Sequence, residues 1–158
     1  MPDGLYDTDI LTWSETQADL LRRVASGQRV NGVDWEHVVE EIADVGISQL
    51  NAVHSLFTQA TLHLIKIHLL PDDLARNHWE DELAAFLGSA GHHYVPSMRQ
   101  RIDLSSVWRR ARASLPRRLT AMPAFMALPI DCPWTLEALL AGDQDALLAA
   151  VPLFGTGH

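Results

Sequence analysis

The sequence predicts an all-α protein, an antiparallel bundle of four long helices with an arginine-rich helix and a short C-terminal helix. Apolar residues recur at helical spacing through most of the chain, and capping residues precede these segments while glycine or proline follows them. No stretch has the pattern of a buried parallel sheet, and neither a GxGxxG nor a GxxxxGK[ST] phosphate-binding loop occurs. The four long helices are expected at residues 9–26, 34–46, 48–70 and 73–88.

Length and composition limit the class of protein further. The 158 residues are enough for one domain that can bury about two-thirds of the surface of the unfolded chain. One cysteine, Cys132, rules out an internal disulfide and fits a reducing compartment. The N-terminus lacks the basic and apolar regions of a signal peptide, and polar side chains interrupt the longest apolar run, about 62–70. We therefore expect a cytoplasmic protein without a membrane span.

The first helix is expected to begin after Asp9 and to end near Gly27, because these residue types favour helix caps. Gln17 lies in the middle of its apolar face. A buried amide without a partner costs about 1–3 kcal/mol, so we expect Gln17 to bond a backbone group or a tryptophan indole. The alternative is that Gln17 is a polar group that lines a pocket. The other residues of this face are Ile10, Trp13, Leu20, Leu21 and Val24.

The second helix is acidic and begins at the N-cap residue Asp34. Glu40 and Asp44 lie on its outer side and are expected to be solvated. An apolar stripe about 120° wide is expected to face the core. It consists of Trp35, Val38, Val39, Ile42 and Val45.

His37 and Glu41 are four residues apart on this helix, so their side chains can reach each other. Such a pair can supply two metal ligands, form an acid–base couple or make a surface hydrogen bond. A short connection at 46–47 would make the next helix an antiparallel neighbour, so His54 or His63 could complete a site. This arrangement would suit a metal-assisted hydrolase or a small-ligand pocket.

Later segments complete the bundle. Ser48 is expected to cap a helix that Pro71 ends, and the next helix is expected to stop at Gly88, with His92 and His93 in the loop after it. Residues 1–118 would form the bundle.

The remaining residues, 119–158, are expected to form a proline-rich connector and a short helix capped by Thr135, packed on the same domain. Leu153 and Phe154 are expected to dock near the C-terminus.

The charge distribution is uneven. The net charge of −8 argues against nucleic acid as a general partner. Residues 97–118 nevertheless carry seven arginines and one acidic residue. Arg99, Arg109 and Arg110 cluster on the outer face of this amphipathic helix. They could contact phosphate, an acidic partner or a membrane surface, or they could neutralise the acidic helices of the same bundle.

Several motif groups resemble a bacterial family known as domain of unknown function 29. The resemblance extends over about residues 5–140 and implies a small, all-helical fold without established activity. Its motifs are Tyr6-Asp7-Thr8-Asp9-Ile10-Leu11-Thr12-Trp13 with Gln17 and Leu20-Leu21, then Asp34-Trp35-x-x-Val38-x-Glu40-Glu41-Ile42 with Val45-Gly46-x-Ser48, then His63-Leu64-Ile65-Lys66, Trp79, and Cys132-Pro133-Trp134-Thr135-Leu136-x-x-Leu139-Leu140.

No catalytic or cofactor motif accompanies these helices. The sequence has no HExxH motif, no Glu-x-x-His repeat and no zinc-binding cysteine set, so we expect no cofactor. The leading hypothesis is a non-catalytic protein-interaction module that binds another protein or itself through an exposed bundle face. The alternatives are the metal-assisted hydrolase or ligand pocket around Glu41 and His37, and nucleic-acid binding through the arginine cluster.

Overall fold

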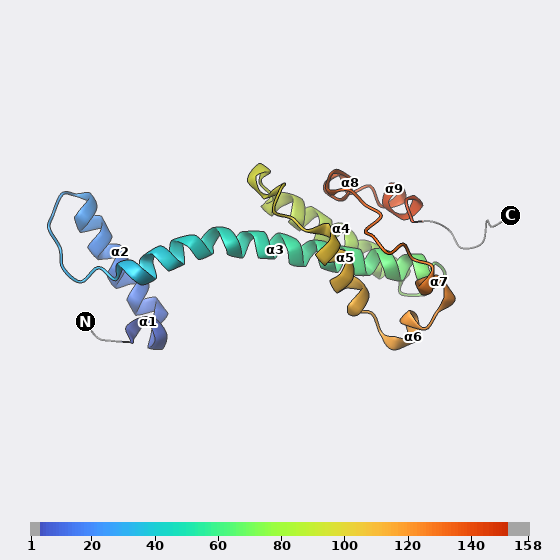
Figure 1. Ribbon diagram of the computed structural model, residues 1–158, viewed down its shortest axis with the longest axis horizontal. Coiled ribbons are helices and arrows are strands. Elements are labelled where there is room, and N and C mark those ends of the chain that lie inside the picture. The colour runs from blue at the N-terminus through green and yellow to red at the C-terminus, as the bar shows by residue number, and fades with distance from the viewer. Residues whose placement is uncertain (1–3, 152–158) are drawn as a thin grey trace. The chain divides into compact units, whose positions relative to one another are not determined.

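The protein is described by a computed structural model that covers residues 4–151 (Figure 1). Every regular element within this range is helical, and the described residues form no strand, so the all-α prediction is confirmed. In chain order the elements are α1 (Leu5–Thr8), α2 (Ile10–Ala25), α3 (Trp35–Leu69), α4 (Arg76–His93), the 3₁₀ turn η1 (Pro96–Met98), α5 (Leu104–Ala113), α6 (Arg117–Thr120), α7 (Pro123–Met126), α8 (Leu136–Ala141) and α9 (Gln144–Ala149).

Helix α3 is one uninterrupted helix of 35 residues, so the expected break at 46–47 is wrong. Gly46 stays in the helix and does not adopt a positive φ. A single glycine inside a helix costs only about 1 kcal/mol relative to alanine, and the helical pattern on both sides outweighs this cost. The two expected antiparallel neighbours are therefore consecutive parts of α3.

Local capping determines the starts of several helices, as predicted. The carboxylate of Asp9 accepts a hydrogen bond from the Thr12 amide at the start of α2. The hydroxyl of Thr135 accepts one from the Ala138 amide at the start of α8. Gly27, which follows α2, has a φ of 88°, a conformation that glycine adopts without strain.

The glycine and proline signals elsewhere were misleading. Helix α4 continues past Gly88, so His92 and His93 lie in its last turn and not in a loop. The proline-rich connector is also partly helical, since it contains α7, which begins with Pro123. A proline fits the first turn of a helix because an amide at that position has no hydrogen-bond partner within the helix. Helix α9 was not expected; the side chain of Asp143 caps it.

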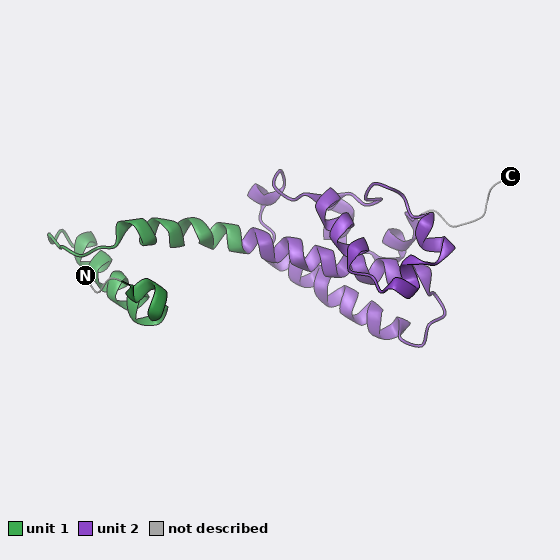
Figure 2. Ribbon diagram, turned by 60° about the horizontal axis from the view of Figure 1, so that its bottom comes forward, with its two compact units in different colours: residues 1–48 green, residues 49–158 purple. Residues whose placement is uncertain are grey.

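The chain divides into two compact units, Met1–Ser48 and Gln49–His158, which we call unit 1 and unit 2 (Figure 2). The division falls after Ser48, whereas the sequence predicted a boundary after residue 118, where the bundle would give way to the proline-rich connector. Helices α4 to α9 all belong to unit 2. The expected docking of Leu153 and Phe154 concerns residues outside the described range.

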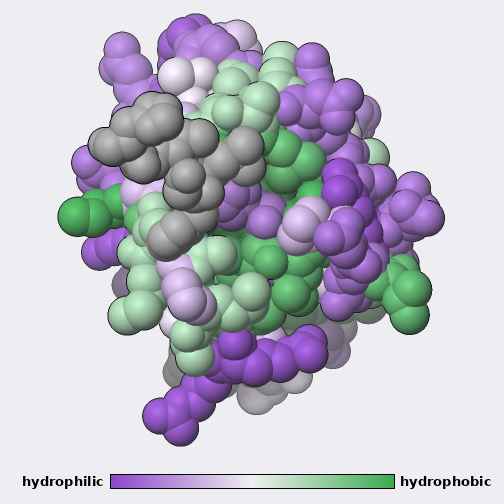
Figure 3. Space-filling model, turned by 90° about the vertical axis from the view of Figure 1, so that its right-hand side faces the viewer, coloured by the Kyte–Doolittle hydropathy of each residue, from purple (hydrophilic) through white to green (hydrophobic). Residues whose placement is uncertain are grey.

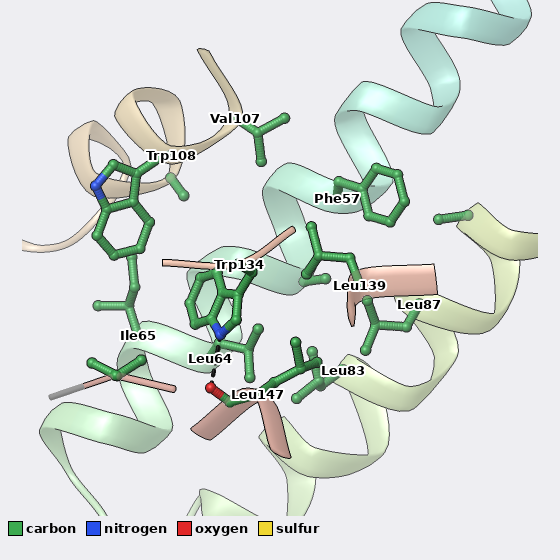
Figure 4. Packing of buried hydrophobic residues seen from close by; sticks show 14 of the residues in the cluster. Phe57, Leu64, Ile65, Leu83, Leu87, Val107, Trp108, Trp134, Leu139 and Leu147 are labelled. Carbon is green, nitrogen blue, oxygen red and sulfur yellow. Dashed lines mark hydrogen bonds between the residues drawn. The ribbon is translucent and has the colours of Figure 1, made fainter. Parts of the chain in front are cut away.

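Unit 2 has a hydrophobic core built from residues of six helices, α3, α4, α5, α6, α8 and α9, and from the segment before α8 (Figure 4). The rings of Trp108 and Trp134 meet edge to face at 5.5 Å, and the Trp134 indole donates a hydrogen bond to the carbonyl of Leu147 over 2.7 Å. This bond joins the segment before α8 to α9. The other labelled core residues are Phe57, Leu64, Ile65, Leu83, Leu87, Val107 and Leu139.

The surface of unit 2 also carries apolar side chains, among them Leu74, Met126 and Ile130. Figure 3 shows hydrophobic surface bordered by hydrophilic side chains on the face that it draws. Single exposed apolar residues are normal on protein surfaces. None of the described helices is both long enough and apolar enough to cross a membrane.

Candidate functional site

The start of α3 is held to α2 by the side chains of unit 1. The Asp34 carboxylate accepts a hydrogen bond from the indole of Trp13 over 3.0 Å and contacts the ring of His37 over 2.7 Å. The Asp34 amide donates to the side-chain oxygen of Gln17 over 2.7 Å. Trp13 and Gln17 are both buried. The expectation that Gln17 bonds a backbone group is confirmed.

Tyr6 of α1 closes this arrangement, which we call the α2–α3 junction: Tyr6, Trp13, Gln17, Asp34, His37 and Glu41. The Tyr6 ring stacks on His37, with 3.9 Å between ring centres, and meets Trp13 edge to face at 5.0 Å. Its hydroxyl donates to the Glu41 carboxylate over 2.6 Å. His37 and Glu41 therefore bind different partners, and the expected contact between them does not form.

The protonation of the junction follows from these hydrogen bonds. The bond to His37 lowers the pKa of Asp34 below its usual value, and the bond to Asp34 raises the pKa of His37. The bond to Glu41 raises the pKa of Tyr6 to about 12. Both carboxylates are thus occupied by neighbouring donors. Through these hydrogen bonds the junction joins α1 and α2 to the start of α3.

A hollow of about 250 Å³ lies beside the junction. Tyr6, Trp13, Asp34 and His37 line it, together with the first residues of α1. Glu41 is not part of the lining. A ligand pocket at this place would therefore use His37 without Glu41.

The four candidate metal ligands all lie on α3, and the structure does not bring them together. Glu41 and His54 are thirteen positions apart on one continuous helix, which is about 20 Å at 1.5 Å per residue. The Nδ1 atom of His54 contacts the Leu50 carbonyl, and its Nε2 atom accepts the Asp103 amide. No group of three or more metal-binding side chains occurs within residues 4–151.

His63 is buried and has partners of its own. Its Nδ1 atom lies 2.8 Å from the Gln59 carbonyl, and its Nε2 atom lies 2.5 Å from the Glu82 carboxylate of α4. The two ring nitrogens thus contact oxygen atoms of two different helices, α3 and α4. The bond to His63 lowers the pKa of Glu82. His63 therefore joins α3 to α4 within unit 2.

The three arginines singled out by the charge pattern have different environments. Arg99 forms an ion pair with Glu137 of α8. Among the described residues it is the one arginine of the segment 97–118 that has an ion pair. Arg109 and Arg110 are exposed on α5. Within the described range, the expected neutralisation of acidic helices is thus limited to the contact between Arg99 and α8.

The apolar stripe at the start of α3 is exposed, so the expectation that it faces the core is wrong. Trp35, Val39, Ile42 and Val45, which we call the α3 apolar face, are 56%, 62%, 68% and 67% exposed. Val38 is the one member of the stripe that is buried. The α1 and α2 segments bond α3 through its other side, which carries Asp34, His37 and Glu41.

These features define the class of protein: a small all-helical protein with a closed polar junction and an open apolar helix face. The chain belongs to the family described as Domain of unknown function DUF29, whose family model matches residues 5–144. This membership confirms the family resemblance seen in the sequence.

A solved structure is also similar to this chain. It is an alpha-helical protein of unknown function from Rhodospirillum rubrum ATCC 11170, with 28% sequence identity and a TM-score of 0.64. The similarity covers 91% of this chain and 95% of that chain. A comparison with curated proteins found no match.

Proposed function

We propose that this protein is a non-catalytic protein-interaction module that binds a partner helix through the α3 apolar face. The observation that carries the proposal is the exposure of Trp35, Val39, Ile42 and Val45, each of which presents more than half of its surface. They follow one another at intervals of three or four residues, which is the spacing at which one helix packs against another. An unpaired row of large apolar side chains marks an interaction surface.

The charges beside this face indicate the chemistry of the partner. Glu36 is exposed on one flank of the face and begins an acidic row, which Glu40 and Asp44 continue at four-residue intervals onto the outer side of α3. A partner helix with lysine or arginine next to its own apolar stripe would match this row.

A second copy of the chain suits the face less well. In a two-fold pair the same surface of each copy meets itself, which would bring two acidic rows together. Like charges at such positions are destabilising. The proposal therefore commits to a basic amphipathic helix of another protein.

The α2–α3 junction supports this function by keeping the face open. It fastens α1 and α2 to the side of α3 that carries His37 and Glu41. Tyr6, Trp13 and Asp34 also belong to the motifs that carry the family resemblance. We infer that these motifs preserve the join that presents the face. The single cysteine supports a reducing location such as the bacterial cytoplasm.

A synthetic peptide tests the proposal directly. An 18-residue amphipathic helix of leucine and lysine, labelled with a fluorophore, is titrated with the whole protein while anisotropy is measured. The matched variants are Ile42→Gln on the face and Leu74→Gln, which removes a fully exposed apolar side chain from unit 2. Burial of one such side chain contributes about 1.5–3 kcal/mol, so Ile42→Gln should weaken binding roughly tenfold or more. Leu74→Gln should change it less than about twofold.

Three outcomes would contradict the proposal. The first is equal affinity of Ile42→Gln and wild type for the peptide. The second is equal binding of a leucine–glutamate peptide, because the acidic row should repel it. The third is a concentration-dependent dimer in sedimentation that Ile42→Gln abolishes, because the occupant of the face would then be a second copy.

A further inference from the structure

We propose that a hollow between α3 and α5 in unit 2 binds the phosphate group of a small ligand. The hollow has a volume of about 480 Å³, which is ample for a phosphate and a small attached group. Its lining is polar and includes two arginines, three hydroxyls and an amide. These residues are Arg101, Arg110, Ser55, Thr58, Ser106 and Asn51.

The arginines give the hollow its charge. Neither Arg101 nor Arg110 has an ion pair or a side-chain hydrogen bond to any residue in the described part of the chain. A smaller hollow of about 380 Å³ adjoins the first, since Ser106 and Arg110 line both, and it adds Arg109. The planar guanidinium group presents paired donors that match two oxygens of a phosphate.

Fixed hydrogen bonds shape the wall that carries these arginines. His54 accepts the Asp103 amide at Nε2 over 3.0 Å, so its proton lies on Nδ1, which faces the Leu50 carbonyl. The Asp103 carboxylate in turn accepts the Ser106 amide and caps α5. His54 is thus a positioning residue that ties the loop before α5 to α3.

Asp103 is also the one carboxylate in the lining, and its charge opposes an anion. Three arginines, Arg101, Arg109 and Arg110, line the two adjoining hollows, so their positive charge exceeds the single negative charge of Asp103. The hydroxyl of Ser55 can donate to a further phosphate oxygen, whereas that of Thr58 donates to the His54 carbonyl. The arrangement therefore favours an anion that has several acceptors over a single carboxylate.

A small phosphate ligand fits the chain better than a nucleic acid does. A polynucleotide is held by an extended row of cations, and the affinity grows with each phosphate that is neutralised. Arg99, which would extend the row, is paired with Glu137. The net charge of −8 repels a long polyanion but opposes a compact one much less.

Calorimetric titration of the whole protein with inorganic phosphate and with phosphoserine, at low salt, tests the site. Arg110→Gln and Arg101→Gln remove one cation each from the hollow. Arg118→Gln is the matched control, because Arg118 is exposed in α6 and its change alters the net charge equally. We expect each hollow variant to weaken phosphate binding at least tenfold and the control to change it less than twofold. Circular dichroism shows whether the variants remain folded.

Other results would overturn the proposal. Absence of phosphate and phosphoserine binding by the wild-type protein would do so, as would an equal loss in Arg118→Gln. Malonate that binds as tightly as phosphate would show that the site does not select phosphate. A single-stranded oligonucleotide that binds more tightly than phosphoserine and depends equally on Arg118 and Arg110 would replace the small ligand with a polynucleotide.

Discussion

Replacing Gln17 by leucine tests whether the α2–α3 junction holds α2 in place. Gln17 is 6% exposed, and its side-chain oxygen accepts the Asp34 amide over 2.7 Å. Leucine has a similar size but no acceptor, so the Asp34 amide loses its partner in a partly buried place. An unsatisfied group of this kind costs about 1–3 kcal/mol, and the added apolar contact of leucine offsets part of it. We expect a net loss of about 1–2 kcal/mol in the local stability of α2.

Amide hydrogen exchange measures this loss where it occurs, because a segment can open without unfolding the whole protein. A loss of about 1.4 kcal/mol corresponds to tenfold faster exchange of the α2 amides. The control is Gln28→Leu, because Gln28 is exposed and bonds only Arg23 in the described range. The reasoning would be refuted by unchanged exchange in α2, by equal acceleration in the control, or by equal acceleration in α4.

Two further predictions concern other parts of the chain. The buried hydroxyl of Thr61 has no hydrogen-bond partner within residues 4–151, so Thr61→Val should raise the free energy of unfolding by about 1 kcal/mol in urea denaturation. Thr58→Val removes a bond to the His54 carbonyl and should be neutral or destabilising; a stabilisation equal to that of Thr61→Val would contradict the argument. In an NMR titration, the His37 ring should have a pKa above 6.5, and Asp34→Asn should return it toward that value. The pair's contribution to stability is therefore complete between about pH 3.8 and pH 6.5, and it is lost as the pH rises through the raised pKa of His37 or falls through the lowered pKa of Asp34. A wild-type His37 pKa at or below 6.5 would show that the pair is absent.

The helix starts were predictable because an N-cap acts over three residues. Asp9 and Thr135 cap the helices that their positions indicated. Helix ends were less predictable, because a glycine ends a helix only where tertiary contacts do not continue it. Gly46 remains helical, so α3 is one long helix where two were expected. Gly88 also remains helical, so α4 continues past its expected end.

The candidate site was predictable only in part. Spacing along one helix singled out His37 and Glu41, and both do belong to the junction. Their partners, however, come from distant positions: Tyr6 is 35 residues before Glu41, and helical periodicity contains no information on such pairs. Periodicity also located the stripe that includes Ile42, but it could not show whether another element covers it.

The continuity of α3 has a consequence for how the chain folds. A cut after Ser48, where the two units divide, would leave four carbonyl and four amide groups without helical partners. Starting a helix is unfavourable, whereas adding residues to an existing one is not. The turns of α3 that are buried in the core of unit 2 can therefore serve as the nucleus from which its first turns grow. Two units with separate contacts would in this way share a single folding event.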